Sequence, residues 1–332
     1  MHSGTVLVTG ACGFIGSHVS EALLSRGRSV IGVDSLDSFY GEEIKRGNLA
    51  EVEATAQREG ARFVFARADI RDEKAMAALL EEHGVESVIH LAARAGVRPS
   101  IAEPALYADV NVRGTSGVFE ACRRAGVGRV VMASSSSVYG NASRVPFSEE
   151  DKCLEPISPY AATKRACELL AHTQRHLHGT RIACLRFFTA FGERQRPDLA
   201  ISTFMRKMMR GEPITVFGDG SMARDFTYIG DIVAGVLAAE ERIDEHGLRI
   251  WNLGGSSPVT VTQLVRAIEE VSGIEARVEH KPVQPGDVER TYADLTRSGR
   301  ELGFAPKTSL REGLTRQWAW MTERASAGAA RA

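Results

Sequence analysis

Short apolar runs alternate with longer amphipathic segments along the first 190 or so residues of the chain. The runs contain few polar residues and have the length of buried strands. They lie at residues 5–8, 29–33, 62–66, 85–91, 129–133 and 181–188. The intervening segments repeat apolar residues at helical spacing, as Met76, Leu79 and Leu80 do. This alternation predicts right-handed crossovers, and therefore an α/β fold built on a Rossmann-type doubly wound parallel sheet.

The alternation changes after residue 189, where glycine, proline and charged residues interrupt it. A chain of 332 residues also exceeds what one core usually serves, so a smaller α+β lobe is expected on the C-terminal side. We place the sheet domain at residues 1–189 with a return at about 224–254, the smaller lobe at 190–223 and 255–325, and a flexible tail at 326–332.

The composition is that of an ordinary globular protein, with 43% hydrophobic and 25% charged residues. The formal net charge of −1 gives no electrostatic reason to expect nucleic acid or an anionic membrane as a partner. No signal peptide or membrane-spanning stretch is visible. The five cysteines include no CxxC pair, which favours reduced thiols in a cytoplasm over disulfides or a metal site.

The run at residues 5–8 leads into a Gly-x-x-Gly-x-x-Gly motif made of Gly10, Gly13 and Gly16, with Phe14 and Ile15 inside it. Between a strand and a helix, the first glycine permits a tight turn, the second admits a pyrophosphate and the third lets helix and strand pack closely. The amides at the start of the helix then face the phosphates. The motif predicts a dinucleotide site.

Asp34 ends the second predicted strand, roughly 20 residues after the glycine loop, where an acidic residue bonds the adenosine ribose hydroxyls. A carboxylate there repels a 2′-phosphate, so NAD is predicted as the cofactor in preference to NADP. The alternative is an aspartate that only ends a strand.

Other strand ends also carry residues that suit a ligand site. These are Asp69, Ile70, Leu91, Ala92 and Ala93. Asn111 stands among apolar residues in a long helical pattern at 99–125, and it either bonds the cofactor region or caps buried backbone.

Tyr160 and Lys164 are four residues apart where the sequence predicts a helix, so their side chains share one helix face. A lysine near a tyrosine hydroxyl favours the phenolate, which could then exchange a proton near neutral pH. The alternative is a packed ring beside a solvated amine. Upstream, the strand at 129–133 leads into the hydroxyls of residues 134–137, where open α/β sheets bind ligands. A serine-rich turn is the simpler interpretation of that segment.

Taken together, these motifs resemble the extended short-chain dehydrogenase/reductase family, and within it the nucleotide-sugar 4-epimerases. The resemblance runs from residue 5 to about residue 320. It implies that Tyr160 takes the proton of the sugar's 4-hydroxyl as hydride moves from carbon 4 to NAD. It also implies that Ser135 bonds the same oxygen and that Lys164 bridges the nicotinamide ribose. The 4-keto sugar then rotates and receives the hydride on its other face.

The family's dehydratases and decarboxylases typically carry a carboxylate between the positions of Ser135 and Tyr139. This chain has Ser136 and Ser137 there, which favours epimerisation. A nucleotide-sugar reductase, a decarboxylase of the same fold and a non-catalytic NAD-binding protein remain as alternatives.

The resemblance also assigns positions in the smaller lobe. Thr215 and Phe217 match those that hold uracil, Arg224 matches a contact to the diphosphate, and Asp287 belongs to a nucleotide-binding loop. Taken alone, Arg224 beside Asp225 would be a surface ion pair. Many glucose-type epimerases have arginine where this chain has Gln284.

The chain looks most like the UDP-glucuronate 4-epimerases, because of residues 187–189, 194–198 and 284–287, and of residues 38–40 followed by Lys45 and Arg46. Arg196 with the Thr189 hydroxyl could hold the carboxylate at carbon 6 by a charge-assisted pair. Arg196 could equally pair with Asp198 or with phosphate, so UDP-glucose is the second candidate. The resemblance further implies a homodimer formed through helices at 99–125 and 159–178.

Overall fold

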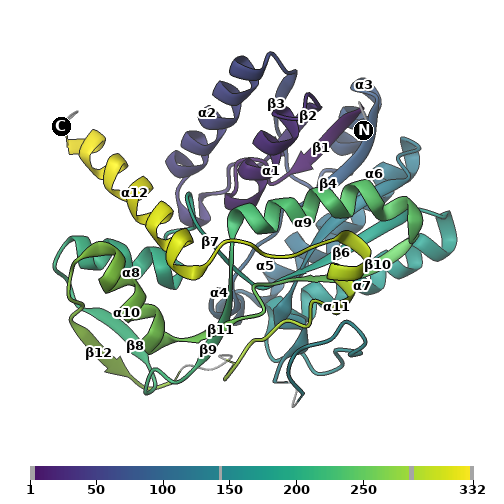
Figure 1. Ribbon diagram of the computed structural model, residues 1–332. Helices are drawn as coiled ribbons and strands as arrows, with labels where there is room; N and C mark the ends of the chain where they lie inside the picture. The colour runs from purple at the N-terminus through teal and green to yellow at the C-terminus, as the bar shows by residue number, and fades with distance from the viewer. Residues whose placement is uncertain (1–3, 142–143, 284–287, 330–332) are drawn as a thin grey trace.

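The computed structural model describes residues 4–141, 144–283 and 288–329. Its centre is a seven-stranded sheet in the order β10-β6-β5-β4-β1-β2-β3, in which all neighbouring strands are parallel (Figure 1). The strands are β1 (Thr5–Thr9), β2 (Ser29–Asp34), β3 (Phe63–Arg67), β4 (Val85–His90), β5 (Arg129–Ser135), β6 (Arg181–Phe187) and β10 (Leu248–Leu253). The predicted doubly wound sheet is confirmed.

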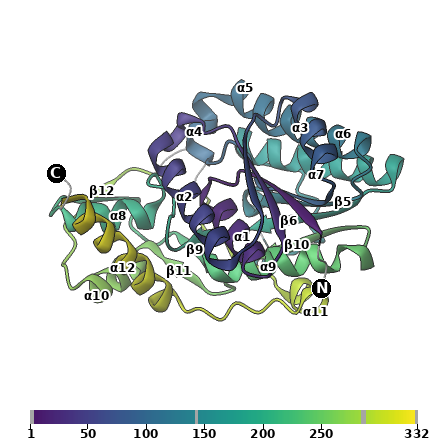
Figure 2. The same cartoon turned by 90° about the horizontal axis from the view of Figure 1, so that it is seen from above.

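Helices cover both faces of this sheet (Figure 2). One face carries α1 (Phe14–Leu24), α2 (Glu42–Glu59) and α9 (Ile229–Arg242), and the other carries α3 (Glu73–Glu82), α6 (Gly114–Arg124) and α7 (Pro159–His178). Because side chains alternate along a strand, Val6 and Val8 enter the first core and Leu7 enters the second. Burial on both faces explains why the strands are continuous apolar runs in the sequence.

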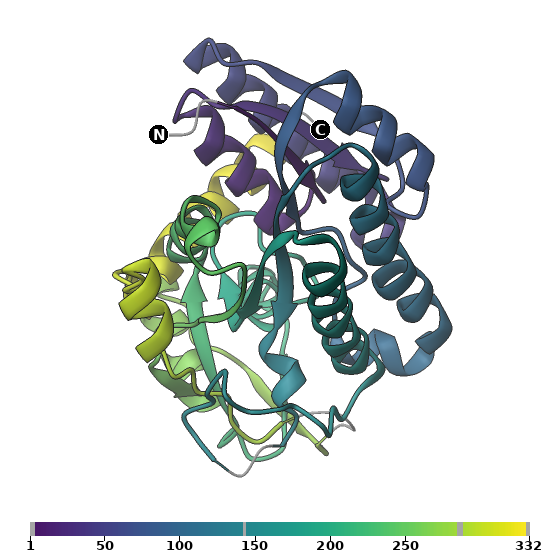
Figure 3. The ribbon, with the colours of Figure 1, turned by 90° about the vertical axis from the view of Figure 1, so that its right-hand side faces the viewer.

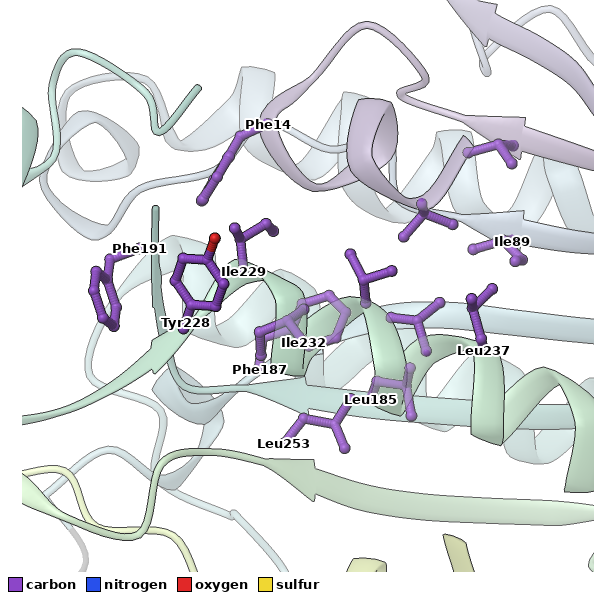
Figure 4. Close-up of a cluster of buried hydrophobic side chains, with 14 of the residues drawn as sticks. Phe14, Ile89, Leu185, Phe187, Phe191, Tyr228, Ile229, Ile232, Leu237 and Leu253 are labelled. Atoms are coloured by element: carbon purple, nitrogen blue, oxygen red, sulfur yellow. The ribbon is translucent and has the colours of Figure 1, made fainter. Parts of the chain in front are cut away.

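The core between α9 and the sheet extends toward the start of α1 (Figure 4). Ile232 and Leu237 of α9 lie over Leu185 of β6, and Phe14 sits at the end of the same cluster. Phe14 is the first residue of α1, so this core fixes the position of the helix end that follows the glycine loop.

The smaller lobe joins two short sheets to three helices. β8 (Ile214–Phe217) pairs with β12 (Val278–Lys281), and β9 (Ala223–Tyr228) lies between β7 (Thr189–Phe191) and β11 (Pro258–Thr260). The helices are α8 (Ala200–Met209), α10 (Val261–Ser272) and α12 (Leu310–Ala329). The predicted tail therefore begins inside a helix. Within the described ranges, no helix is both long and apolar enough to cross a membrane.

The helical pattern predicted at 99–125 is confirmed, with one interruption at Glu103 that was not predicted. Its parts are α4 (Val97–Ala102), α5 (Pro104–Tyr107), the π-helical segment η2 (Ala108–Arg113) and α6. Pro104 lacks a backbone N–H and disfavours helical geometry at the preceding Glu103, whose φ and ψ are −129° and 53°. The remaining short elements are η1 (Ser38–Tyr40), η3 (Ser136–Tyr139), η4 (Ile243–Glu245) and α11 (Thr296–Leu302).

Helix α7 packs against α6 on the side that faces the viewer in Figure 3. It is fixed at its ends and in its middle. The Ser158 hydroxyl accepts a hydrogen bond from the Ala161 N–H at the helix start, and Gly179 ends the helix in the left-handed conformation. In the middle, the buried Glu168 carboxylate accepts two hydrogen bonds of 2.9 Å from Arg186 of β6 and one of 2.7 Å from the Ser134 hydroxyl of β5. Burial opposes ionisation of Glu168, but Arg186, Ser134 and Arg165 together outweigh it and lower the carboxyl pKa.

Arg186→Met should destabilise the protein by up to about 3–5 kcal/mol, because the buried Glu168 carboxylate then keeps only the partly exposed Arg165, at 3.0 Å, as a cationic partner. The free energy of unfolding from urea titration would measure this. The double variant Glu168→Gln, Arg186→Met is the matched control and should be less destabilised, since no unpaired charge is left in the core. A double variant as unstable as the single one would contradict the assignment.

Candidate active site

A cavity of about 470 Å³ opens at the carboxyl ends of the central strands. β1 and β4 are neighbours in the sheet although β2 and β3 lie on the other side of β1, so the strand order reverses at this point. Open α/β sheets bind ligands at such a reversal. Most of the residues predicted from the sequence line the cavity. They are Gly10, Gly13, Phe14, Ile15, Gly16, Asp34, Asp69, Ile70, Leu91, Ala92, Ala93, Ser135, Ser136, Ser137, Tyr160, Lys164, Thr189, Arg196 and Arg224.

The glycine loop leaves no room for side chains at two of its glycines. A Cβ on Gly16 would lie 2.0 Å from the Gly10 carbonyl oxygen, and a Cβ on Gly10 would lie 2.9 Å from the Ala92 nitrogen. Gly10 also has a φ of +71°, which L side chains rarely adopt. The loop therefore brings α1, β1 and the end of β4 into close contact, with the backbone at the start of α1 exposed to the cavity, as a pyrophosphate requires.

Asp34 organises the wall of the cavity beside this loop. Its buried carboxylate accepts hydrogen bonds from the N–H groups of Cys12 (3.1 Å) and Leu36 (2.8 Å) and lies 3.4 Å from the Lys45 ammonium. It is thus more than a residue that ends a strand, since it joins the glycine loop to the segment after β2. Lys45 also lines the cavity, and its pairing with Asp34 is visible only in the structure.

Asn111 caps buried backbone, as one of its two interpretations has it, while a bond to the cofactor region stays a prediction. Its carbonyl accepts from the Arg94 N–H at 2.8 Å, and its amide donates to the Arg94 carbonyl and the Thr163 hydroxyl, both at 3.0 Å. It is not among the described residues that line the cavity. Asn111 therefore holds the segment after β4 against α7.

His90 has a comparable role that the sequence did not reveal. Its ring nitrogens bond the hydroxyls of Thr9 (2.7 Å) and Thr115 (3.0 Å), which joins the ends of β1 and β4 to α6. Burial, followed by the nearby Lys164 charge, lowers the pKa of His90 to about 3, so the ring is neutral at physiological pH.

Tyr160 and Lys164 lie on adjacent turns of α7 and line the cavity together. The Lys164 ammonium is buried and donates to the Ala133 carbonyl at 2.9 Å, so the alternative of a solvated amine is wrong. The Tyr160 ring packs edge to face against Tyr107, with the centroids 6.3 Å apart. At the end of β5, the Ser135 hydroxyl also lines the cavity and lies 3.1 Å from that of Ser137.

Arg196 reaches the cavity from the loop between β7 and α8. Its Nε and Nη2 donate to the Asp198 carboxylate at 3.0 and 2.6 Å, so this alternative pairing is present in the structure. The guanidinium also packs over the rings of Phe39 and Tyr40, 5.3 and 6.0 Å from their centroids. These two rings line the cavity and were not predicted as site residues.

Of the residues predicted in the smaller lobe, some line the cavity and others do not. Arg224 lines the cavity, and its neighbour Asp225 is no surface partner, because that carboxylate is buried and accepts from the N–H groups of Gly255 (2.8 Å) and Ala293 (2.9 Å). Thr215 and Phe217 lie on β8, outside the lining of the cavity. The predicted positions Gln284 and Asp287 lie outside the described residues.

These features define an NAD-dependent enzyme of the short-chain dehydrogenase/reductase type: the glycine loop, the acidic residue at the end of β2, and the buried lysine one turn from a tyrosine. Residues 6–254 match the NAD dependent epimerase/dehydratase family, and the chain belongs to this family. The predicted cofactor, NAD, is thus the one on which the family depends.

Relatives and solved structures extend over nearly the whole chain. A UDP-glucuronate 4-epimerase of Thermodesulfobacterium geofontis is 40% identical, over 96% of this chain and 97% of its own. A UDP-glucuronic acid 4-epimerase from Bacillus cereus, solved with UDP-glucuronic acid and NAD, is 34% identical with a TM-score of 0.88, over 96% and 99% of the two chains. A UDP-glucose 4-epimerase from Thermotoga maritima, solved with UDP-glucose, is 33% identical with a TM-score of 0.87, over 97% and 99%.

The protein should bind NAD at least about tenfold more tightly than NADP, a difference of ~1.4 kcal/mol, because the Asp34 carboxylate repels a 2′-phosphate. Calorimetric titration of cofactor-free protein would measure both affinities. Asp34→Asn keeps the size of the side chain and should narrow the difference. Equal binding of the two cofactors by the unchanged protein would refute the role of Asp34.

Proposed function

We propose that this protein is an NAD-dependent UDP-sugar 4-epimerase whose substrate is UDP-glucuronate, converted to UDP-galacturonate. The observation that carries the proposal is the composition of the cavity wall. Tyr160, Lys164 and Ser135 line it, while its only carboxylates among the described residues are Asp34, Asp37 and Asp69, which lie at or just after the ends of β2 and β3. The serine segment thus offers no acid or base for chemistry at carbon 5 or 6, as a dehydratase needs.

Bound NAD supplies the acceptor and donor of the hydride at carbon 4. The Tyr160 phenol oxygen takes the proton of the 4-hydroxyl and returns it when the sugar is reduced on its other face. The buried Lys164 ammonium, held by the Ala133 carbonyl, stabilises negative charge on that oxygen. The Ser135 hydroxyl donates to the sugar oxygen, and rotation of the keto sugar between the two steps inverts the carbon.

Preference for a uronate rests on Arg196 and Thr189. The Arg196 side chain is only 12% exposed, and no hydrogen bond among the described residues uses its Nη1. Asp198 therefore orients the guanidinium and leaves donors for a substrate carboxylate at carbon 6. Oxidation at carbon 4 makes a β-keto acid that readily loses carbon dioxide, so a grip on the carboxylate protects the intermediate. The likeness to the Thermotoga enzyme keeps UDP-glucose as the second candidate.

We also propose that the protein is a homodimer. Leu169 and Leu177 of α7 are 54% and 69% exposed, and Ile101 of α4 is also exposed. Large apolar side chains that gather on a helix face favour contact with another chain.

The cytoplasmic location predicted from the cysteines stays a prediction.

Tyr160→Phe should lower the epimerisation rate by about 10²–10⁴-fold, because the ring packing is kept while the proton acceptor is lost. Product formation from UDP-glucuronate, followed by proton NMR, would measure this, and NAD content should not change. Tyr107→Phe is a matched control in which the neighbouring ring loses its hydroxyl. Substantial activity in the Tyr160 variant would refute the proton-transfer role.

Arg196→Ala should reduce turnover of UDP-glucuronate by at least about tenfold more than turnover of UDP-glucose, since only the uronate carries the charge that Arg196 binds. Separate kcat/KM values for the two substrates would test this. Arg210→Ala removes an exposed arginine that pairs with Glu212 and serves as the control. Equal losses for the two substrates would rule out the carboxylate contact.

A further inference from the structure

The loop that carries Arg196 has a conformation that its own sequence does not favour. Gly192 and Arg194 have φ values of +136° and +62°, and arginine rarely adopts a positive φ. Such a conformation persists only where the surroundings impose it. The contacts that impose it therefore also decide where the Arg196 guanidinium lies.

Gln317 makes contacts at both ends of this turn. It lies on α12, is completely buried, and accepts a hydrogen bond from the Gly192 N–H at 3.0 Å. Its amide donates to the Gln195 side-chain oxygen (3.0 Å) and to the Ser202 hydroxyl (3.1 Å). A single side chain thus holds the residue that begins the turn, the residue that precedes Arg196, and the first turns of α8.

Gln195 completes the network from inside the loop. Its amide donates to the Ala190 carbonyl at 3.0 Å, and its oxygen accepts from the N–H (3.2 Å) and hydroxyl (2.8 Å) of Ser202. Both glutamine side chains use their donor and acceptor groups inside the protein, where no water competes. Buried networks of this kind are rigid when complete and costly when one member is missing.

The opposite side of the loop is fixed through α1 and β9. Arg194 contacts His18 (2.7 Å) and Glu21, and the Tyr228 hydroxyl donates to the Glu193 carboxylate at 2.9 Å. Burial, followed by the Arg194 charge, lowers the pKa of His18 to about 3, so this ring is a neutral partner. These contacts hold residues 193 and 194, whereas the Gln317 amide holds the two residues that flank them.

We propose that Gln317 is a positioning residue for Arg196, and that it suppresses loss of carbon dioxide from the oxidised sugar. Gln317 is not among the described residues that line the cavity, so it acts only through the loop. This inference rests on the proposed function. When the loop shifts, Arg196 no longer holds the carboxylate in the plane of the carbon 4 carbonyl. In that plane the C5–C6 bond is stable.

The competing reaction is decarboxylation of the 4-keto sugar, which needs no further reactant except water. The C5–C6 bond breaks, carbon dioxide leaves, and the electron pair passes into the enolate formed by carbon 5, carbon 4 and the carbonyl oxygen. Carbon 5 then takes a proton from water, and a UDP-4-keto-pentose results while the cofactor stays reduced. The ratio of this product to the epimer therefore reports how well the carboxylate is held.

Gln317→Leu tests the proposal in the full-length protein with its cofactor. Proton NMR after incubation with UDP-glucuronate should show the ratio of keto-pentose to epimer raised by about ten- to a hundredfold, the effect of a displacement of about 1 Å at a reacting group. The rate of UDP-glucose epimerisation should fall by a much smaller factor than the factor by which this product ratio rises.

Ile268→Ala is the matched control for stability. Ile268 is completely buried on α10, which packs against α12, and it makes no part of the amide network. It should lower the melting temperature and leave the product ratio unchanged. If Gln317→Leu does not fold, Ser202→Ala, which removes one partner of the network, should still raise the ratio.

An unchanged product ratio in the variants of the network, or an equal rise in Ile268→Ala, would overturn the positioning role while leaving the proposed function intact. Failure of the unchanged protein to convert UDP-glucuronate would overturn the proposed function, and this inference with it.

Discussion

The close approach of Gly16 to the Gly10 carbonyl is the constraint on which the site depends. Because the gap cannot hold even a Cβ, α1 begins directly against the end of β1, and its first amides face the cavity. A second close approach, between Gly10 and Ala92, leaves no room for a side chain beside the end of β4, where His90 and Thr9 are hydrogen bonded. The glycine loop and the packing of the sheet therefore depend on two close approaches that share Gly10.

Helix α7, which carries Tyr160 and Lys164, is fixed to this sheet by polar groups and not only by apolar packing. Lys164 bonds the backbone of β5, and Glu168, one turn later, bonds side chains of β5 and β6. These contacts are directional, so they set the rotation of α7 as well as its distance from the sheet. An apolar interface alone would tolerate small rotations that move Tyr160 away from Ser135.

The sequence was most informative where a feature depends on neighbours along the chain. The strands, the glycine loop and the spacing of Tyr160 and Lys164 are local patterns, and the structure places those residues at one cavity. Asn111 could not be decided from sequence, because its partner Arg94 is brought to it by the fold. Gln317 gave no signal at all: a glutamine in an amphipathic helix is ordinary until a loop 122 residues away in sequence packs on it. The division at 99–125 could have been found, since Pro104 marks it.

Arg196 contacts two parts of the reaction at once. Its guanidinium lines the cavity and packs on Phe39 and Tyr40, which belong to the wall that follows β2. Under the proposed function, opening that wall to exchange the cofactor would disturb the residue that binds the sugar. A dehydrogenase with net turnover of NAD would have to make this opening in every cycle. A redox-neutral cycle does not, so the two sites can share a wall without slowing the enzyme.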